Sequence, residues 1–167
     1  MTAAVGLAVL ARCGDDDGGD DGECGSGTFT TEAVRSGSTW TANRGGTTLY
    51  SGSDMAAAVR AAVDGLTADR TSQERVVVRG SGSMPASASI DLPSHTSLEV
   101  CGTIDVTGSA SANNAAIRIR HARDVSVPHL RLTGAPYFGI WVRTSSDVHL
   151  GQIDLRLSGG HGIRIDS

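Results

Sequence analysis

Short runs of alternating apolar and polar residues recur at a fixed spacing in the last third of the chain. Residues 116–119, 139–142 and 162–165 carry this pattern and begin 23 residues apart each time. Alternation predicts β-strands, and a fixed period of this length indicates a repeat architecture. Because each run is too short to bury its own apolar face, neighbouring repeats must cover it. The pattern therefore predicts a stack of β-coils.

Two further apolar pairs follow the first run within each repeat. In the repeat that begins at residue 116, Val125 and Val127 form the second pair, and Leu130 and Leu132 form the third. Leucine-rich repeats have one strand in a shorter repeat, and propeller blades are longer antiparallel units. We therefore expect an all-β protein, a parallel β-helix with three short strands and about 23 residues per coil.

The apolar spacing changes to three or four residues before the first coil. Ser53 is a suitable N-cap, Asp54 lies in the first turn, and the spacing predicts an amphipathic helix over residues 54–66. Residues 76–78 are three valines and predict a buried strand. A helix at this place would cover the apolar core and the unpaired strand edges at the first coil.

The order of these features resembles a known superfamily. A helix, a valine-rich strand, a Gly-rich turn at residues 79–82, the segment SIDLPSHTSLEVCGTI at residues 89–104 and repeated coils are similar to secreted pectin-lyase-like proteins. The resemblance covers residues 53–167 and implies a right-handed β-helix with an N-terminal cap helix. The superfamily contains polysaccharide lyases, glycoside hydrolases and non-enzymatic surface proteins, so the fold does not determine the reaction. Its pectate lyases use calcium, which is the cofactor that the resemblance implies.

The repeat pattern stops one strand into a new coil at Ser167. Pectin-lyase-like enzymes usually have many more coils than the three or four that are visible here. We therefore expect the chain to be the N-terminal part of a longer protein, a truncated gene product, or a chain that a partner completes. An uncovered end would favour aggregation or oligomerisation.

The first residues indicate export. Residues 3–11 form an apolar run with the length of a signal-peptide core, without a basic segment before it. The sequence LARC, which ends at Cys13, resembles a bacterial lipoprotein cleavage box, although Arg12 stands where a small residue is usual. We expect a secreted or envelope-tethered protein, with a lipid on Cys13 as its only contact with a membrane.

A linker rich in Gly and Asp follows. A calcium site is the alternative interpretation of this acidic run. The predicted division is a partial signal or lipoprotein-like segment at residues 1–13, a linker at 14–27, and the N-terminal portion of a β-helix domain at 28–167.

Three cysteines are consistent with this division. If Cys13 carries a lipid, Cys24 and Cys101 remain as a disulfide pair in an oxidising compartment. The alternative is that Cys101, at a corner of a coil, is a small buried residue. The sequence has no cysteine spacing typical of zinc sites.

The net charge of −4 averages two unlike regions. Residues 15–23 hold six carboxylates, whereas residues 116–167 hold seven Arg and four Asp. The chain has no Lys, which excludes Schiff-base and P-loop lysine chemistry within it. Arginine suits bidentate contacts with carboxylates.

The repeat also predicts which side chains point outward. Since Ile117 and Ile119 face inward, Arg118 and Arg120 face outward. Stacked coils then form one outward column of Asp91, Arg118, Trp141 and Arg164, and a second of Pro93, Arg120, Arg143 and Asp166. Arginines around an exposed Trp suit an acidic sugar chain, whereas the alternative is an ordinary polar surface. The predicted substrate-binding residues are Arg118, Arg120, Tyr137, Trp141, Arg143, Arg164 and Asp166.

Other motifs identify no catalytic residue. The tripeptide at residues 160–162, Gly-His-Gly, occurs in polygalacturonases but is more simply a turn into a strand. Tyr137 belongs to a segment that forms either an aromatic subsite wall or a cap on a corner. His149 is expected outward beside Ser126 and Glu99, and nothing nearby completes a nucleophilic triad.

The predicted function is therefore action on an acidic polysaccharide, by elimination or hydrolysis, with catalytic residues mostly beyond Ser167. The alternative is a non-catalytic β-helix that binds glycans or mediates adhesion. We expect no nucleic-acid partner. This stretch alone is expected to be inactive, whereas the full-length protein is expected to be a polysaccharide lyase or glycoside hydrolase.

Overall fold

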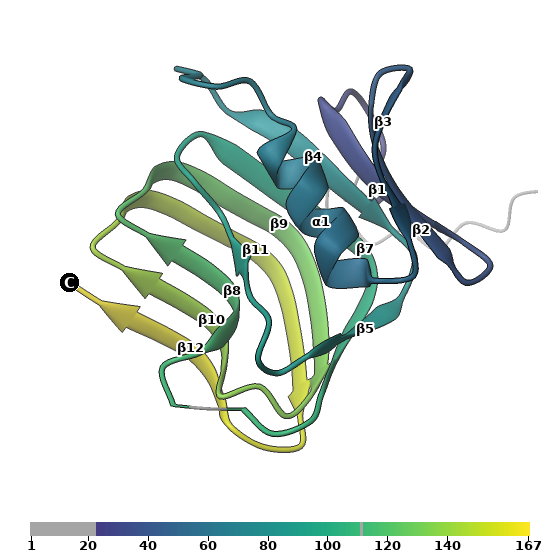
Figure 1. Cartoon of the computed structure of the whole chain (residues 1–167). Helices are drawn as coiled ribbons and strands as arrows, with labels where there is room; N and C mark the ends of the chain where they lie inside the picture. Colours follow the sequence, from purple (N-terminus) through teal and green to yellow (C-terminus); the bar gives the residue numbers. More distant parts are fainter. Residues whose placement is uncertain (1–22, 111) are drawn as a thin grey trace, which may run out of the picture.

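The computed structural model describes residues 23–110 and 112–167. They form a parallel β-solenoid of about four turns with one short helix (Figure 1). The first elements are β1 (Thr31–Ser36), β2 (Thr39–Arg44), β3 (Thr47–Gly52), α1 (Met55–Asp64), β4 (Glu74–Arg79) and β5 (Gly82–Pro85). The coils continue with β6 (Ile90–Asp91), β7 (Thr96–Thr107), β8 (Ala115–Arg120), β9 (Arg123–Gly134), β10 (Phe138–Arg143), β11 (Ser146–Leu157) and β12 (His161–Asp166).

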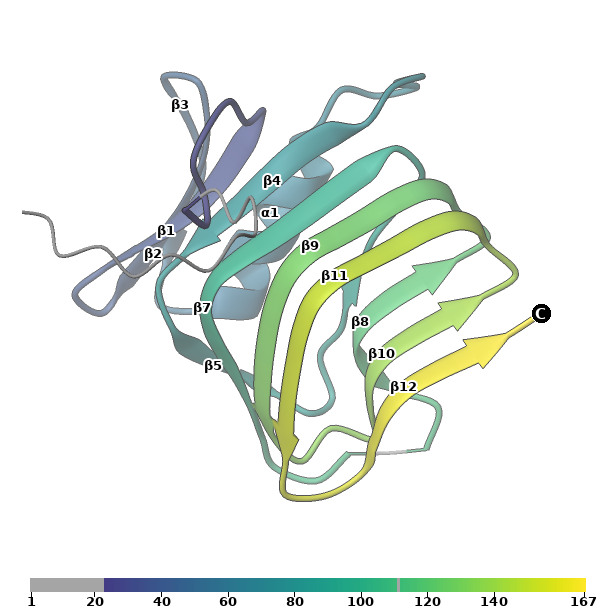
Figure 2. The ribbon, with the colours of Figure 1, turned by 180° about the vertical axis from the view of Figure 1, so that it is seen from behind.

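Two sheets enclose the core. The larger has the strand order β11-β9-β7-β4-β1-β2-β3, with β5 beside β7, and the smaller has the order β12-β10-β8-β6. Figure 2 shows β7, β9 and β11 side by side in one wall and β8, β10 and β12 in the other. The inward side chains of both walls form one continuous apolar core that also includes α1.

The 23-residue spacing is confirmed by the pairing of the last coils. Ile117 pairs with Ile140, and Ile140 pairs with Ile163, so equivalent residues of successive coils lie side by side. The preceding coil is longer, because Ile90 pairs with Ile117, 27 residues later. Ile163 lies on the edge strand β12 and is 44% exposed, whereas Ile117 and Ile140 are fully buried.

Each repeat contains two strands where the sequence predicted three. The predicted second and third strands lie together on one 12-residue strand that bends at the corner of the coil, as β9 and β11 show (Figure 2). Val127 and Leu130 are both buried although they are three residues apart, so the alternation shifts by one residue near Pro128. Pairing continues on both sides of this shift. The corner therefore bends the strand without dividing it.

Gly134 occupies the end of β9, where only glycine fits. Its φ of +88° lies in the left-handed region, and a Cβ at this position would lie 2.1 Å from the carbonyl oxygen of Val106 in the preceding coil. The close approach of the two backbones explains why a Thr-Gly pair ends this strand.

The helix is shorter than predicted. It covers Met55–Asp64 where the sequence predicted residues 54–66. Asp54, not Ser53, is the N-cap, because its Oδ1 accepts a hydrogen bond from the backbone N–H of Ala57 at 3.0 Å. The extended backbone of Asp54 (φ −89°, ψ 110°) is that of an N-cap residue, so the prediction of Ser53 was wrong by one position.

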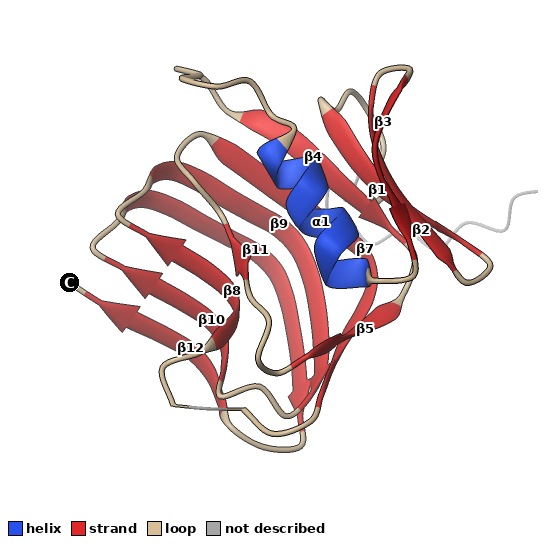
Figure 3. Cartoon of the chain, in the orientation of Figure 1, coloured by secondary structure: helices blue, strands red, loops and turns tan. Residues whose placement is uncertain are grey.

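An antiparallel meander, which the sequence did not predict, precedes the helix. β1, β2 and β3 pair in antiparallel fashion, and β1 continues the larger sheet through parallel pairing with β4. Figure 3 shows the helix lying beside this meander at the first-coil end of the solenoid. A buried hydrogen bond joins the two, since Thr31 Oγ1 donates to the carbonyl oxygen of Ala62 at 2.8 Å.

The segment before β1 is held against the solenoid. Cys24 and Cys101 form a disulfide with a Cα–Cα distance of 5.5 Å. Arg79 Nη2 donates to the carbonyl oxygen of Gly25 at 2.7 Å, and Arg75 Nη1 donates to that of Thr28 at 3.1 Å. The last residues of the predicted linker therefore lie on the outer side of β4 and β7. Cys13 and the predicted signal segment lie outside the described residues.

Candidate functional site

The smaller sheet presents two columns of outward side chains. Strand pairing places Asp91, Arg118, Trp141 and Arg164 in one column, and Arg120, Arg143 and Asp166 in the other. Neighbours in a column lie about 4.8 Å apart, which is the strand spacing. We call this surface of β6, β8, β10 and β12 the arginine face, and its members are Asp91, Arg118, Arg120, Trp141, Arg143, Arg164 and Asp166.

Internal ion pairs occupy part of the arginine face. Arg118 Nε donates to Asp91 Oδ1 at 2.9 Å, and Arg120 approaches the same carboxylate at 3.5 Å. Arg164 Nε donates to Asp166 Oδ2 at 2.8 Å. Arg118 and Arg164 are therefore held in place by carboxylates of the chain itself.

Trp141 points outward from the coil but is only 6% exposed, contrary to the expected exposed indole. Phe138 packs beside it with ring centroids 5.8 Å apart, and the Arg164 guanidinium lies 5.5 Å from the indole centroid. The indole Nε1 donates to Asp166 Oδ2 at 2.7 Å. This hydrogen bond, together with the bond and charge of Arg164, holds the pKa of Asp166 below its usual value.

In the described residues, the side chains of Arg120 and Arg143 make no hydrogen bond, although Arg120 forms an ion pair with Asp91 at 3.5 Å and the charge of Arg143 helps to lower the pKa of Asp166. They pair directly across β8 and β10, and both are exposed. The Arg143 guanidinium contacts the Trp141 ring at 6.0 Å, and in the described residues its side chain makes no hydrogen bond or ion pair. Two like charges on directly opposite residues of neighbouring strands repel each other.

The aromatic segment before β10 packs on itself. Tyr137 is half-buried and lies edge-on to Phe138 at 4.7 Å, and His161 lies 5.7 Å from the Tyr137 ring. Gly160 has a φ of +82° and His161 begins β12, so the Gly-His-Gly tripeptide is a turn into a strand, as predicted. Tyr137 lies at the corner between β9 and β10, where Phe138 connects it to Trp141 of the arginine face.

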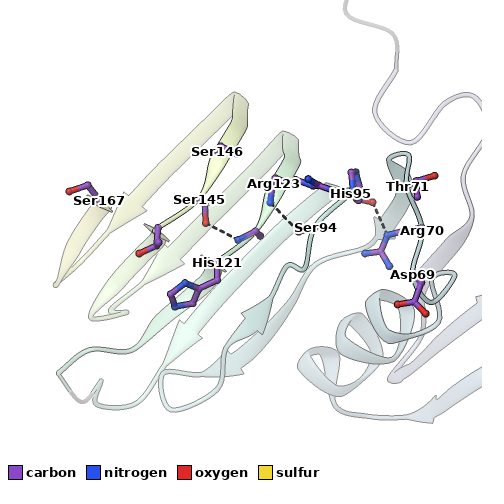
Figure 4. Close-up of a pocket in the computed structure, with 12 residues that line it drawn as sticks. Asp69, Arg70, Thr71, Ser94, His95, His121, Arg123, Ser145, Ser146 and Ser167 are labelled. Carbon is purple, nitrogen blue, oxygen red and sulfur yellow. Dashed lines mark hydrogen bonds between the residues drawn. The ribbon is translucent and has the colours of Figure 1, made fainter.

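A hollow of about 980 Å³ lies at the corner that follows the arginine face (Figure 4). We call it the corner hollow. His121 lines it from the turn between β8 and β9, Arg123 lines it from the first position of β9, and hydroxyl groups line it from successive coils. His121 also lines the neighbouring hollow that contains Arg118 and Arg120, and Ser167 also lines the one that contains Arg143 and Arg164. The corner hollow is therefore continuous with the arginine face.

The prediction from sequence missed both His121 and Arg123. The repeat spacing does carry a signal for His121, because it places this residue 23 positions before Thr144, and both have positive φ values of 52° and 46°. A left-handed residue at the same place in two coils turns the chain sharply. The side chains near that turn consequently leave the strand pattern, which is why alternation did not identify them.

A second hollow, of about 680 Å³, lies on the larger sheet, and we call it the back hollow. His149 pairs with Ser126, as expected, whereas Glu99 pairs with His129 and lines the same hollow from β7. The Ser126 hydroxyl donates to Gln73 Oε1 at 3.0 Å. Because that proton is directed to Gln73, Ser126 and His149 do not form a nucleophile and base pair.

Two of the three carboxylates that line the back hollow, Asp124 and Glu99, are engaged within the chain, and the third is Asp147. Asp124 Oδ2 lies 2.8 Å from His95 Nδ1, and Asp124 Oδ1 accepts a hydrogen bond from Gln73 Nε2 at 3.3 Å. Glu99 forms an ion pair with Arg75. The back hollow is thus built mainly from internal contacts.

One group of three His, Cys, Asp or Glu side chains in the described residues is close enough together to be considered for a metal ion. In residues 23–110 and 112–167, three side chains with metal-binding atoms within 4.8 Å of one another are Cys24, Glu99 and Cys101. Their two sulfur atoms are joined in the disulfide, and only the thiolate form binds metals. Calcium requires six to eight oxygen ligands, which this group does not supply.

Comparison with known proteins adds no family assignment. No family model, curated protein or solved structure matches the chain. In the described residues, no helix has both the length and the apolar character needed to cross a membrane. Functional inference therefore rests on the surface itself.

Proposed function

We propose that this protein is an exported carbohydrate-active protein that binds an acidic polysaccharide along the arginine face. The observation that carries the proposal is the pairing of Arg120 and Arg143 directly across β8 and β10. A carboxylate bound between the two guanidinium groups would remove their repulsion and accept charge-assisted hydrogen bonds from both. The two positions lie one strand spacing, about 4.8 Å, apart.

The remaining members of the face support this role indirectly. Asp91 holds Arg118, and Asp166 holds Arg164, so these cations have defined positions. The buried indole of Trp141 lies under Arg143 and Arg164. We propose that Trp141 supports the guanidinium groups, since a side chain that is only 6% exposed offers little surface for stacking on a sugar ring.

We further propose membership of the pectin-lyase-like superfamily, with right-handed coils and α1 as the N-terminal cap. α1 lies at the first-coil end of the solenoid, where a cap is required, which supports this assignment (Figure 3). A disulfide between Cys24 and Cys101 supports export, because disulfides persist in oxidising compartments.

Cleavage of the bound chain by β-elimination is the second candidate. Elimination transfers the proton next to the uronate carboxylate to a base and breaks the bond from the β carbon to the glycosidic oxygen. The guanidinium groups of the arginine face would stabilise the negative charge that develops on the carboxylate, and a base outside this face would take the proton. Hydrolysis needs two carboxylates across the scissile bond, whereas Asp91 and Asp166 lie on β6 and β12, at opposite edges of the smaller sheet. The arginine face therefore favours elimination over hydrolysis.

Titration calorimetry with polygalacturonate, alginate and neutral dextran tests the proposal. We expect the wild-type protein to bind the two acidic chains and not dextran. The double variant Arg120→Gln/Arg143→Gln should bind at least about tenfold more weakly, because it loses two charge-assisted contacts. Arg156→Gln is the matched control, since Arg156 lies on β11 in the other sheet and its side chain is 71% exposed. Equal loss in both variants, or no loss in either, contradicts the proposal.

An assay for unsaturated products and new reducing ends separates the candidate reactions. Unsaturated products from polygalacturonate would support elimination, and reducing ends without unsaturation would support hydrolysis. Binding without either product identifies a glycan-binding surface protein.

A further inference from the structure

We propose that the corner hollow is a separate subsite for an anionic group of the glycan, a carboxylate or a sulfate ester, with Arg123 and His121 as its ligands. This inference rests on the proposed function, because it extends the binding surface beyond the arginine face. It assigns a role to two residues that the repeat pattern does not identify.

The cations of the corner hollow differ in their availability. Arg70 uses three of its five N–H donors within the chain, because its Nε donates to the His95 carbonyl oxygen at 2.8 Å and its other nitrogens donate to Thr67 and Thr96. In residues 23–110 and 112–167, the side chains of Arg123 and His121 make no hydrogen bond or ion pair. Both are exposed and line the hollow. Arg123 therefore has five donors free for a ligand.

The rest of the lining suits an oxygen-rich anion. Thr71, Ser94, Thr144 and Ser146 contribute hydroxyl groups, and Ala122 is the one apolar residue among the twelve lining residues. The hydroxyl of Ser145 already donates to the carbonyl oxygen of Arg143 at 2.9 Å. Figure 4 shows these side chains coming from successive coils and from the loop beside Arg70. Hydroxyl groups can donate to the oxygens of a carboxylate or sulfate while the guanidinium supplies the charge. Asp69 is the one carboxylate in the lining.

Continuity with the arginine face indicates where the anion comes from. His121 lines both the corner hollow and the hollow of Arg118 and Arg120. A polysaccharide that lies on the arginine face can therefore place a neighbouring anionic group in the corner hollow without leaving the surface. Its volume of about 980 Å³ is ample for a sugar residue, because small-molecule sites usually span about 300–1,000 Å³.

Binding of a carboxylated chain and a sulfated chain tests the subsite. The probes are polygalacturonate, which carries carboxylates alone, and dextran sulfate, which carries sulfate esters alone, and binding is measured by titration calorimetry with the full chain. Arg123→Gln should weaken binding of at least one probe by about tenfold, and Arg123→Lys should restore part of it because the charge returns. Arg131→Gln is the matched control, because Arg131 is an exposed arginine on the same strand, paired with Asp154, and it does not line the corner hollow.

The outcomes distinguish the subsite from the proposed function. If Arg123→Gln leaves binding unchanged and Arg120→Gln/Arg143→Gln abolishes it, the subsite proposal is overturned and the proposal of binding at the arginine face is retained. If neither probe binds the wild-type protein, the proposed function fails. Titration with inorganic sulfate, followed through the Arg123 side-chain NMR signal, then decides the subsite alone: a saturable shift supports it, and no shift overturns it.

Discussion

At the scale of single residues, Trp141 connects the two columns of the arginine face. Its indole N–H donates to Asp166, which belongs to the second column, while its ring contacts Arg164 from the first. Asp166 accepts hydrogen bonds from both Trp141 and Arg164. The Asp166 carboxylate therefore holds both the Trp141 ring and the Arg164 guanidinium in position.

The lowered pKa of Asp166 provides a test of this contact. Replacing Trp141 with Phe removes the indole donor, so we expect the Asp166 pKa to rise towards its usual value. A group with a lowered folded-state pKa stabilises the fold above its unfolded pKa, and that stabilisation is lost as the pH falls through the folded pKa. NMR titration of the Asp166 carboxyl carbon in both proteins measures the change. An unchanged Asp166 pKa in Trp141→Phe would show that the indole hydrogen bond does not act in solution.

The sequence predicts the direction in which a side chain points better than it predicts how exposed that side chain is to solvent. Alternation correctly placed Trp141 in an outward column between Arg118 and Arg164. Exposure depends on which neighbours fold over the indole, and Phe138 and Arg164 do so through contacts that no periodic pattern encodes.

At the scale of elements, the sequence predicted some strands and the helix but missed other strands. The coil spacing and the three-valine strand β4 follow from strong, regular apolar patterns. The meander β1–β3 was missed, because its sequence contains only short apolar alternation between the Gly-containing turns at residues 37–38 and 45–46. Arg123 and His121 were missed for a related reason, since they lie at a corner where the alternation stops.

The start of α1 yields a matched pair of substitutions. Asp54→Ala removes the side-chain acceptor for the Ala57 N–H, and we expect a loss of about 1 kcal/mol in the free energy of unfolding. Ser53→Ala is the control and should change stability by less than about 0.5 kcal/mol, because Ser53 is exposed and is not the cap. Urea denaturation followed by circular dichroism measures both. A larger loss of stability for Ser53→Ala than for Asp54→Ala would show that Ser53 is the N-cap, as the sequence predicted.

At the scale of the whole molecule, the solenoid and the segment before β1 behave as one unit. The disulfide joins residues 77 positions apart, and Arg75 and Arg79 hold the intervening backbone at Ser26, Thr28 and Gly25. A covalent link across so long a stretch restricts the unfolded chain strongly. The segment therefore contributes to the stability of β4 and β7, on whose outer side it lies.

Removing the disulfide tests that contribution. The variant Cys24→Ser/Cys101→Ser should lose about 2–4 kcal/mol of stability relative to the wild type in denaturant titrations. A reducing agent should lower the stability of the wild type to a similar level and leave the variant unchanged. Equal stability of the oxidised wild type and the variant would show that the link does not hold the fold.

The central claim is that Arg120 and Arg143 together bind the anionic groups of a polysaccharide. The most direct measurement is an NMR titration of the full chain with a purified galacturonate oligosaccharide, followed through the arginine Nε–H signals. The account predicts saturable shifts of Arg120 and Arg143 with a common dissociation constant that weakens with added salt, and no shift of Arg156. Saturable binding that leaves Arg120 and Arg143 unshifted, or no binding at all, would contradict it.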